Sequence, residues 1–233
     1  MKKKVLLITA IVAMLAIMVS GTLAYFTAED EVTNTFTIGS VKIEIYENGN
    51  ATEEGSFEFG KLTPIVNVDA PSEDESYMEK AVKVKNTGKN DAYIRLHIAV
   101  PHALAGTYLC MDWSEDANWV QGANYEITEG EQHYTVYTYN YKVKVAPNGE
   151  TADLLKGVYL ASDVDLQENA DGNLEFIRRI GDYIDESGVV AHTKNDDGSY
   201  TSEKVNILVA AQAIQADGFA DYEAALANFS TAW

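Results

Sequence analysis

The sequence has little cysteine and little proline: Cys110 is the only cysteine, and four prolines are spread over 233 residues. A single cysteine excludes a disulfide within the chain, although oxidising conditions outside the cell would permit one between two copies. The apolar neighbours of Cys110 in TYLCMDW predict a buried, unpaired structural thiol. Because a serine- and glycine-rich tract is also absent, we expect one domain without a linker, stabilised by its core, a bound ion or assembly.

Motifs of the common enzyme classes are missing or incomplete. No G-x-S-x-G segment occurs, which leaves no support for the nucleophile turn of α/β hydrolases. Residues 55–61 fit the first seven positions of a phosphate loop, but Leu62 stands where a serine or threonine would bind magnesium. Glu58 would repel a nucleotide, and Phe57 and Phe59 beside it favour a strand. We therefore expect no catalytic residue.

Metal-binding patterns are also weak. A zinc protease of the common kind needs two histidines one helical turn apart, with a glutamate after the first. None of the histidines is followed by glutamate, so we expect hydrogen-bonded or solvated side chains at His97, His102, His133 and His192. The clusters at residues 163–165 and 196–198 supply oxygen ligands, but without the spacing of an EF-hand loop. We expect no metal site and no cofactor, with weak surface calcium binding as the alternative.

Basic residues are scarce, and three of them precede a hydrophobic run at the start of the chain. The sequence has 17 Lys and Arg against 36 Asp and Glu, and lysines 2 to 4 lead into the apolar residues 5–19. This run is shorter than the ~20 residues of a bilayer-spanning helix and is followed by Thr22-Leu23-Ala24. The pattern predicts a secretory signal at residues 1–24, cleaved between Ala24 and Tyr25, with a retained anchor as the alternative.

The processed chain would be strongly acidic. Its 209 residues would carry 14 basic and 36 acidic side chains, a net charge of −22. Such a surface repels nucleic acid and anionic lipid headgroups, so we expect neither as a partner. We expect a protein without a stable membrane span after processing, secreted to the extracellular matrix or the cell surface.

Alternation of apolar and polar residues predicts an all-β fold: an antiparallel, jelly-roll-like β-sandwich with a few short helices in loops and at the C-terminus. Residues 82–84 and 94–100 flank a turn-rich run and are expected to form a hairpin. The longest strand covers residues 136–145, with Tyr137 and Val143 on the same face. The first strand has an alternating apolar set, namely Phe36, Ile38, Val41, Ile43 and Ile45.

The remaining elements follow from weaker patterns. Residues 154–160 predict a further strand, whereas residues 163–203 are rich in acidic and turn-forming residues and predict an acidic loop insertion with one or two short elements. Residues 204–215 predict the last strand, whose apolar face is small enough to leave room for something large opposite. A short C-terminal helix is predicted by the spacing of Phe219, Tyr222, Leu226 and Phe229.

Three segments carry a resemblance to a known family. They are GTLAYFTAEDEVTNTFTIGSVKIEI at the start, VKNTGKNDAYIRLHI in the centre and AAQAIQADGFADYEAAL near the end. Together they resemble the TasA/camelysin family, secreted proteins of Gram-positive bacteria that a signal peptidase of the SipW type processes. The resemblance implies a subunit of biofilm-matrix or cell-surface fibres, and the name camelysin implies a cell-surface metalloprotease as an alternative. The acidic region between residues 163 and 203 takes no part in it.

These observations lead to a hypothesis for assembly. We expect three parts: the signal at residues 1–24, a donor-strand segment at residues 25–36, and a single sandwich domain at residues 37–233. The donor segment would add a strand to another copy of the protein through main-chain hydrogen bonds, making the protein its own partner. A monomeric surface adhesin remains the third alternative. The apolar side chains expected to anchor the donor segment are Tyr25, Phe26, Val32 and Phe36.

Overall fold

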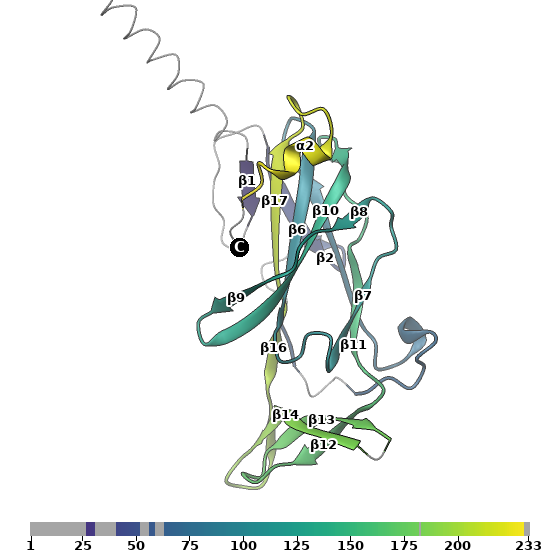
Figure 1. Ribbon diagram of the computed structural model, residues 1–233, viewed down its shortest axis with the longest axis vertical. Coiled ribbons are helices and arrows are strands. Elements are labelled where there is room, and N and C mark those ends of the chain that lie inside the picture. Colours follow the sequence, from purple (N-terminus) through teal and green to yellow (C-terminus); the bar gives the residue numbers. More distant parts are fainter. Residues whose placement is uncertain (1–26, 31–40, 52–55, 59–62, 182, 231–233) are drawn as a thin grey trace, which may run out of the picture.

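The computed structural model describes residues 27–30, 41–51, 56–58, 63–181 and 183–230, most of which lie in antiparallel strands. Two sheets pack face to face, and a smaller sheet continues from one end of this sandwich (Figure 1). The all-β antiparallel fold expected from the sequence is therefore confirmed.

The first sheet, called sheet A, has the strand order β1-β17-β6-β10-β8, with β9 beside β10. Its strands are β1 (Thr27–Asp30), β6 (Ala92–Pro101), β8 (Trp119–Gln121), β9 (Tyr125–Glu129), β10 (Gln132–Val145) and β17 (Leu208–Gln215).

The second sheet, called sheet B, has the order β3-β2-β5-β11-β7. Its strands are β2 (Ile43–Glu47), β3 (Asn50–Ala51), β5 (Met78–Asn86), β7 (Leu109–Trp113) and β11 (Leu155–Leu160). A separate pair joins β4 (Ser56–Glu58) to β16 (Lys204–Asn206), so the strand expected around Phe57 is present.

The core lies between sheets A and B and is filled by alternate residues of their strands. Ile94, Leu96 and Ile98 of β6 and Val82 and Val84 of β5 are fully buried in one cluster. Burying each such side chain contributes about 1.5–3 kcal/mol, which makes this core the main favourable contribution to folding. The alternation expected in the first strand is confirmed where the structure describes it, because the following side chains are buried: Val41, Ile43 and Ile45.

The expected hairpin between residues 82–84 and 94–100 is wrong, because the two strands belong to different sheets. β5 pairs with β2 and β11 in sheet B, whereas β6 pairs with β10 and β17 in sheet A. Buried Asn86 holds the crossing: its side-chain amide donates to the carbonyls of Asn90 and Val145, both at 2.8 Å, and its oxygen accepts from Gly88 N–H at 2.9 Å. The turn-rich run is thus a connection between layers.

The longest strand is confirmed as β10, but its alternation breaks near the end. The register with β6 shifts between Tyr141 and Val145, which are separated by four residues while their partners, Ile94 and Ala92, are separated by two. This bulge turns Val143 outward, where it is 45% exposed, instead of leaving it on the face of Tyr137 as the sequence predicted.

Residues 163–203 form strands, contrary to the expected loops. The distal sheet has the order β12-β13-β14-β15 and lies at the end of the molecule opposite the C-terminal helix (Figure 1). Its acidity is compatible with strands because Asp163 and Asp165 pair with Arg178 and Arg179. Its buried Phe176 ring lies 6.3 Å from that of Tyr108, which ties the sheet to the sandwich core. The strands are β12 (Val164–Glu168), β13 (Leu174–Ile180), β14 (Tyr183–Lys194) and β15 (Tyr200–Ser202).

Two smaller expectations have different outcomes. The C-terminal helix is confirmed as α2 (Tyr222–Leu226), and the Asp221 side chain caps it by accepting from Ala224 N–H at 2.9 Å. Cys110 is free, but it is only half-buried on the edge strand β7, so its expected burial is wrong in degree. Partial burial raises the pKa of its thiol, which keeps the group protonated at neutral pH.

Gly157 of β11 leaves room for an aromatic ring. A Cβ atom at this position would lie only 2.2 Å from Cζ of Tyr77, whose hydroxyl donates to Asp112 Oδ2 at 2.8 Å. Burial and then this hydrogen bond raise the pKa of Tyr77 above its ordinary value. The ring, which belongs to the residue just before β5, therefore packs with the glycine of β11 and the carboxylate of β7 as one unit.

We expect Gly157→Ala to lower the free energy of unfolding by about 2 kcal/mol, because the added methyl group forces Tyr77 off the strand. Urea denaturation of purified protein measures this loss. The matched test is Gly157→Ala in a Tyr77→Ala background, where the methyl group has space and costs far less. An equal cost in both backgrounds would contradict the proposed packing.

Candidate assembly site at the edge of sheet A

The short strand β1 forms one edge of sheet A. Its residues pair antiparallel with β17, from Thr27 opposite Ile214 to Asp30 opposite Ala211. Figure 1 shows β1 lying alongside β17 near the end that carries α2. Because β17 has eight residues and β1 only four, this ladder covers half of the β17 edge.

This strand lies within the donor segment expected from the sequence. Residues 27–30 belong to the segment 25–36, and they add a strand to the domain of the same chain. The residues named for signal cleavage and for anchoring lie outside the described residues, namely Ala24, Tyr25, Phe26, Val32 and Phe36.

The small face of the last strand is not open to a strand from another copy. Its side chains are buried in the core between the two sheets, in one cluster with β2 and β6. The residues concerned are Val205, Ile207, Val209, Ala211 and Ala213. Strand addition therefore uses the backbone edge of β17, and the small face is already occupied by the core.

A row of polar side chains crosses the outer face of sheet A next to β1. Gln212 of β17, Arg95 of β6 and Asn140 of β10 stand opposite one another, and Glu29 of β1 is in register with Gln212. Arg95 Nε donates to Asn140 Oδ1 at 2.8 Å, and its guanidinium lies 4.5 Å from the centre of the Phe229 ring. The C-terminal segment thus covers this row.

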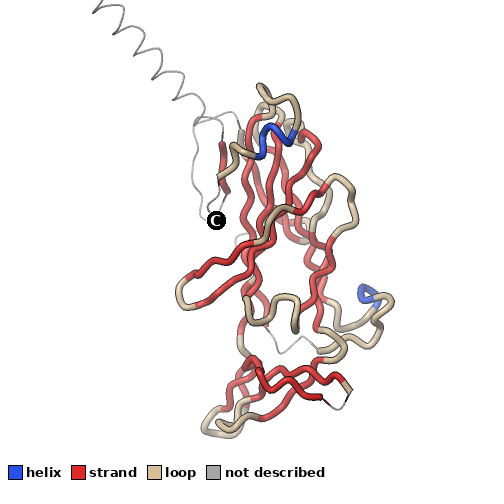
Figure 2. The backbone as a smooth tube through the Cα atoms, viewed as in Figure 1, coloured by secondary structure: helices blue, strands red, loops and turns tan. Residues whose placement is uncertain are grey.

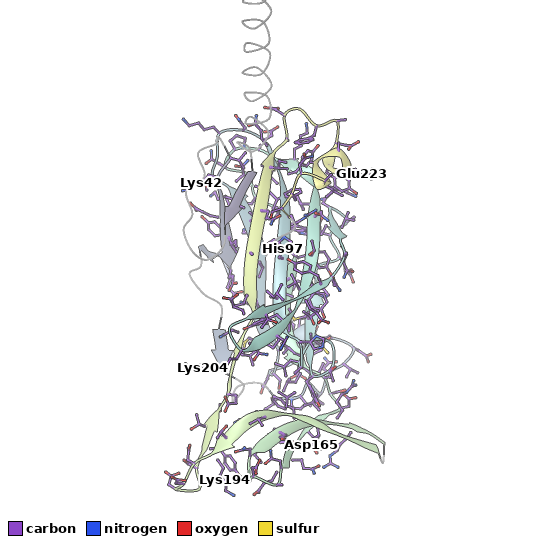
Figure 3. All side chains as sticks on the ribbon, turned by 60° about the vertical axis from the view of Figure 1, so that its left-hand side comes forward. Lys42, His97, Asp165, Lys194, Lys204 and Glu223 are labelled. Atoms are coloured by element: carbon purple, nitrogen blue, oxygen red, sulfur yellow. The ribbon has the colours of Figure 1, made fainter. Side chains whose placement is uncertain are left out.

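His97 occupies the next row and is almost fully buried, at 3% exposure. Figure 3 shows it midway along the long strands. Its Nδ1 lies 3.2 Å from Thr138 Oγ1 and 3.3 Å from the Tyr125 hydroxyl, as expected for a hydrogen-bonded histidine. Burial, and then the charge of Arg95, lower the pKa of His97 to about 4, so the ring is neutral at pH 7.

The other candidate ligands do not converge in the described residues. His133 lies near the turn of the β9–β10 hairpin, hydrogen-bonded to Thr128, and His102 follows β6 and is hydrogen-bonded to Thr135 of β10. His192 lies in the distal sheet beside Ser202. Across the described part of the chain, no group of three His, Cys, Asp or Glu side chains is placed to hold a metal ion.

Comparison with known proteins does not extend this picture: the chain matches no family model and no curated protein. Within the described ranges, no helix is long and apolar enough to cross a bilayer.

The pairing of β1 with β17 was not predictable from the sequence. Residues 27–30 read TAED, a polar stretch without the apolar alternation that signals a half-buried strand. They join the sheet through backbone pairing with the edge of β17, and no local sequence pattern encodes that pairing. The strand character of residues 208–215, by contrast, is evident from their alternation and was expected.

The low pKa of His97 makes stability depend on pH. Below its ordinary pKa near 6.5 the unfolded state takes up a proton that the folded state resists, so stability falls as the pH drops from about 6.5 to about 4. The loss attributable to His97 approaches about 3 kcal/mol at the acid end. We expect His97→Asn, which does not titrate, to remove this part of the pH dependence in urea denaturation curves. The same slope in both proteins would contradict the assignment.

Proposed function

We propose that this protein is a secreted structural subunit that assembles into cell-surface or biofilm-matrix fibres by exchanging its N-terminal strand with a neighbouring copy. The observation that carries the proposal is the four-residue ladder between β1 and the edge of β17. It supports a donor role because the same main-chain hydrogen bonds can form within one chain or between two.

The chain between β1 and the sandwich is long enough for exchange. Ten residues separate Asp30 from Val41, and a fully extended stretch of that length spans at most ~35 Å. A donor strand on a neighbour leaves the donor's own β17 edge open to a third copy. Each subunit then gives one strand and accepts another, a heterologous contact that produces an open filament rather than a closed dimer.

The register of the ladder indicates which way the proposed anchor side chains would point in the fibre. If the pairing continued beyond Asp30 opposite Ala211, Val32 would stand opposite Val209. Phe36 would stand opposite Val205, which in the monomer already pairs with Phe57 of β4. Val209 and Val205 both belong to the buried core. In the fibre, an extended donor strand would therefore direct Val32 and Phe36 toward the apolar interior and Thr33 and Thr35 away from it.

The resemblance to the TasA/camelysin family supports the same function, since it implies an exported fibre subunit. A camelysin-like metalloprotease and a monomeric surface adhesin are the competing functions. Casein hydrolysis that stops on adding a chelator would favour the protease. A monomer at every ionic strength would favour the adhesin.

We expect protein beginning at Tyr25 to form fibres, more readily as salt screens its net charge, and protein beginning at Ile38 to stay monomeric while keeping its fold. Negative-stain images and sedimentation measure the difference, and circular dichroism checks the fold. In full-length mature protein, Val32→Asp/Phe36→Asp should block fibres and the control Thr33→Asp/Thr35→Asp should not. Equal fibre formation with and without residues 25–37 would exclude the donor role.

A disulfide can show whether the strand is exchanged. Ala28 and Ala213 are register partners, so cysteines at both positions, with Cys110→Ser, would bond β1 to β17. We expect oxidation of the monomer to block fibre formation until a reductant is added. Oxidation after assembly should instead give covalent ladders on a denaturing gel. Only monomer bands from oxidised fibres would mean that assembly leaves β1 on its own chain.

A further inference from the structure

The most exposed apolar side chains lie on the loop of residues 63–77, called here the valine loop. Val66 is 89% exposed and Val68 is 57% exposed. The loop is nevertheless held in one shape, because the Asp74 carboxylate accepts from the backbone N–H groups of Val66, Asn67 and Ser76 at 2.7–2.9 Å. A single exposed valine needs no explanation, but two on a loop fixed by its own carboxylate form a small presented surface.

The valine loop is also strictly acidic. Asp69, Glu73 and Glu75 are exposed, and residues 63–77 include no lysine or arginine. In the described part of the chain, none of these three carboxylates forms an ion pair with a basic side chain. The surface that fits the valine loop is therefore apolar at its centre and bordered by cations.

The bulge in β10 has this composition. Residues 142–144, called here the lysine bulge, place Val143 at 45% exposure between two exposed lysines, Lys142 and Lys144. Lys144 Nζ lies 5.8 Å from the centre of the Tyr93 ring, and neither lysine is ion-paired within the described residues. Two exposed valines, Val66 and Val68, thus lie on an acidic surface, and a third, Val143, lies on a basic one.

The two surfaces lie far apart on the molecule. β10 ends beside α2 at one end of the sandwich, whereas the short helix η2 (Pro71–Glu73) in the valine loop lies farther along the long axis (Figure 2). The backbone around Ile65 joins β11, whose Leu160 carbonyl accepts from Ile65 N–H at 3.2 Å. One copy therefore cannot bring its own valine loop onto its own lysine bulge.

We propose that the valine loop of one copy docks on the lysine bulge of a second copy. This inference rests on the proposed function. It adds a second contact between neighbouring copies, made by side chains, to the one made by the exchanged strand. Because the two surfaces differ and each copy has both, the contact is heterologous and continues along an assembly. The valines exclude water while the carboxylates and lysines fix the orientation.

The contact is small, so it supplements strand exchange and does not replace it. A few buried valines and exposed ion pairs fall well short of the area that holds a stable complex alone. Val66→Ser/Val68→Ser should accordingly raise the critical concentration for fibres about tenfold. The fold should stay intact because both side chains are exposed.

The decisive test reverses the charges on each surface. One variant carries Lys142→Glu/Lys144→Glu, and the other carries Asp69→Lys/Glu73→Lys/Glu75→Lys. Each alone would meet like charges at the contact and should form no fibres at a concentration just above the critical concentration of the unchanged protein. Mixed in equal amounts they restore two attractive contacts, acidic bulge on basic loop and basic bulge on acidic loop, so the mixture should form fibres.

Matched variants control for net charge. The controls make the same charge changes on exposed residues elsewhere and should leave assembly near normal. They are Glu126→Lys/Glu129→Lys/Glu131→Lys on the β9–β10 hairpin and Lys156→Glu/Lys204→Glu.

Normal fibres from each surface variant alone, or none from their mixture, would overturn the contact while leaving strand exchange in place. If the unchanged protein forms no fibres, the proposed function fails, and sedimentation velocity of the mixture decides the contact: a complex supports it, and monomers alone refute it.

Discussion

The structure depends on how the edge of β17 is satisfied. A strand at the edge of a sheet presents backbone N–H and C=O groups that remain open to any other strand. Here β1 covers four of the eight residues of β17, and its sequence, TAED, has no large apolar residue. A short strand at this edge shields the monomer from pairing with other strands, and it can still be replaced. The same edge is therefore the candidate assembly site.

The features that could be predicted from the sequence are those set by burial along a single strand. Ile94, Leu96 and Ile98 alternate because one face of β6 enters the core, and that pattern exists in any sandwich containing the strand. The strand of residues 136–145, which the structure begins at Gln132, and the helix after Asp221 were expected for similar local reasons. Their signals are the repeat of apolar residues and a capping side chain, both of which act within a few residues.

The features that could not be predicted depend on contacts distant in sequence. The turn-rich run after Asn86 is equally suited to a hairpin and to a crossing between sheets. The crossing is favoured by the bond from Asn86 to Val145, which lies 59 residues away. The distal sheet was not predicted, because its charged residues neutralise one another across strands: Arg178 pairs with Asp163, just before β12, and Arg179 pairs with Asp165 on β12. Which strands are neighbours in each sheet therefore depends on contacts within the folded core and not on local sequence patterns.

In the proposed assembly, exchange of β1 has to compete with its return to its own chain. A tethered strand has a high effective concentration at its own edge, so a neighbour must offer more contacts than the four-residue ladder provides. A longer ladder along the uncovered half of β17 and the docking of the valine loop would supply that difference only between copies. After the proposed signal cleavage, the charge of −22 would raise the concentration at which this happens. Salt would lower that concentration by screening the repulsion. A short, polar first strand would thus suit the proposed function, in which the subunit stays monomeric until it is exported.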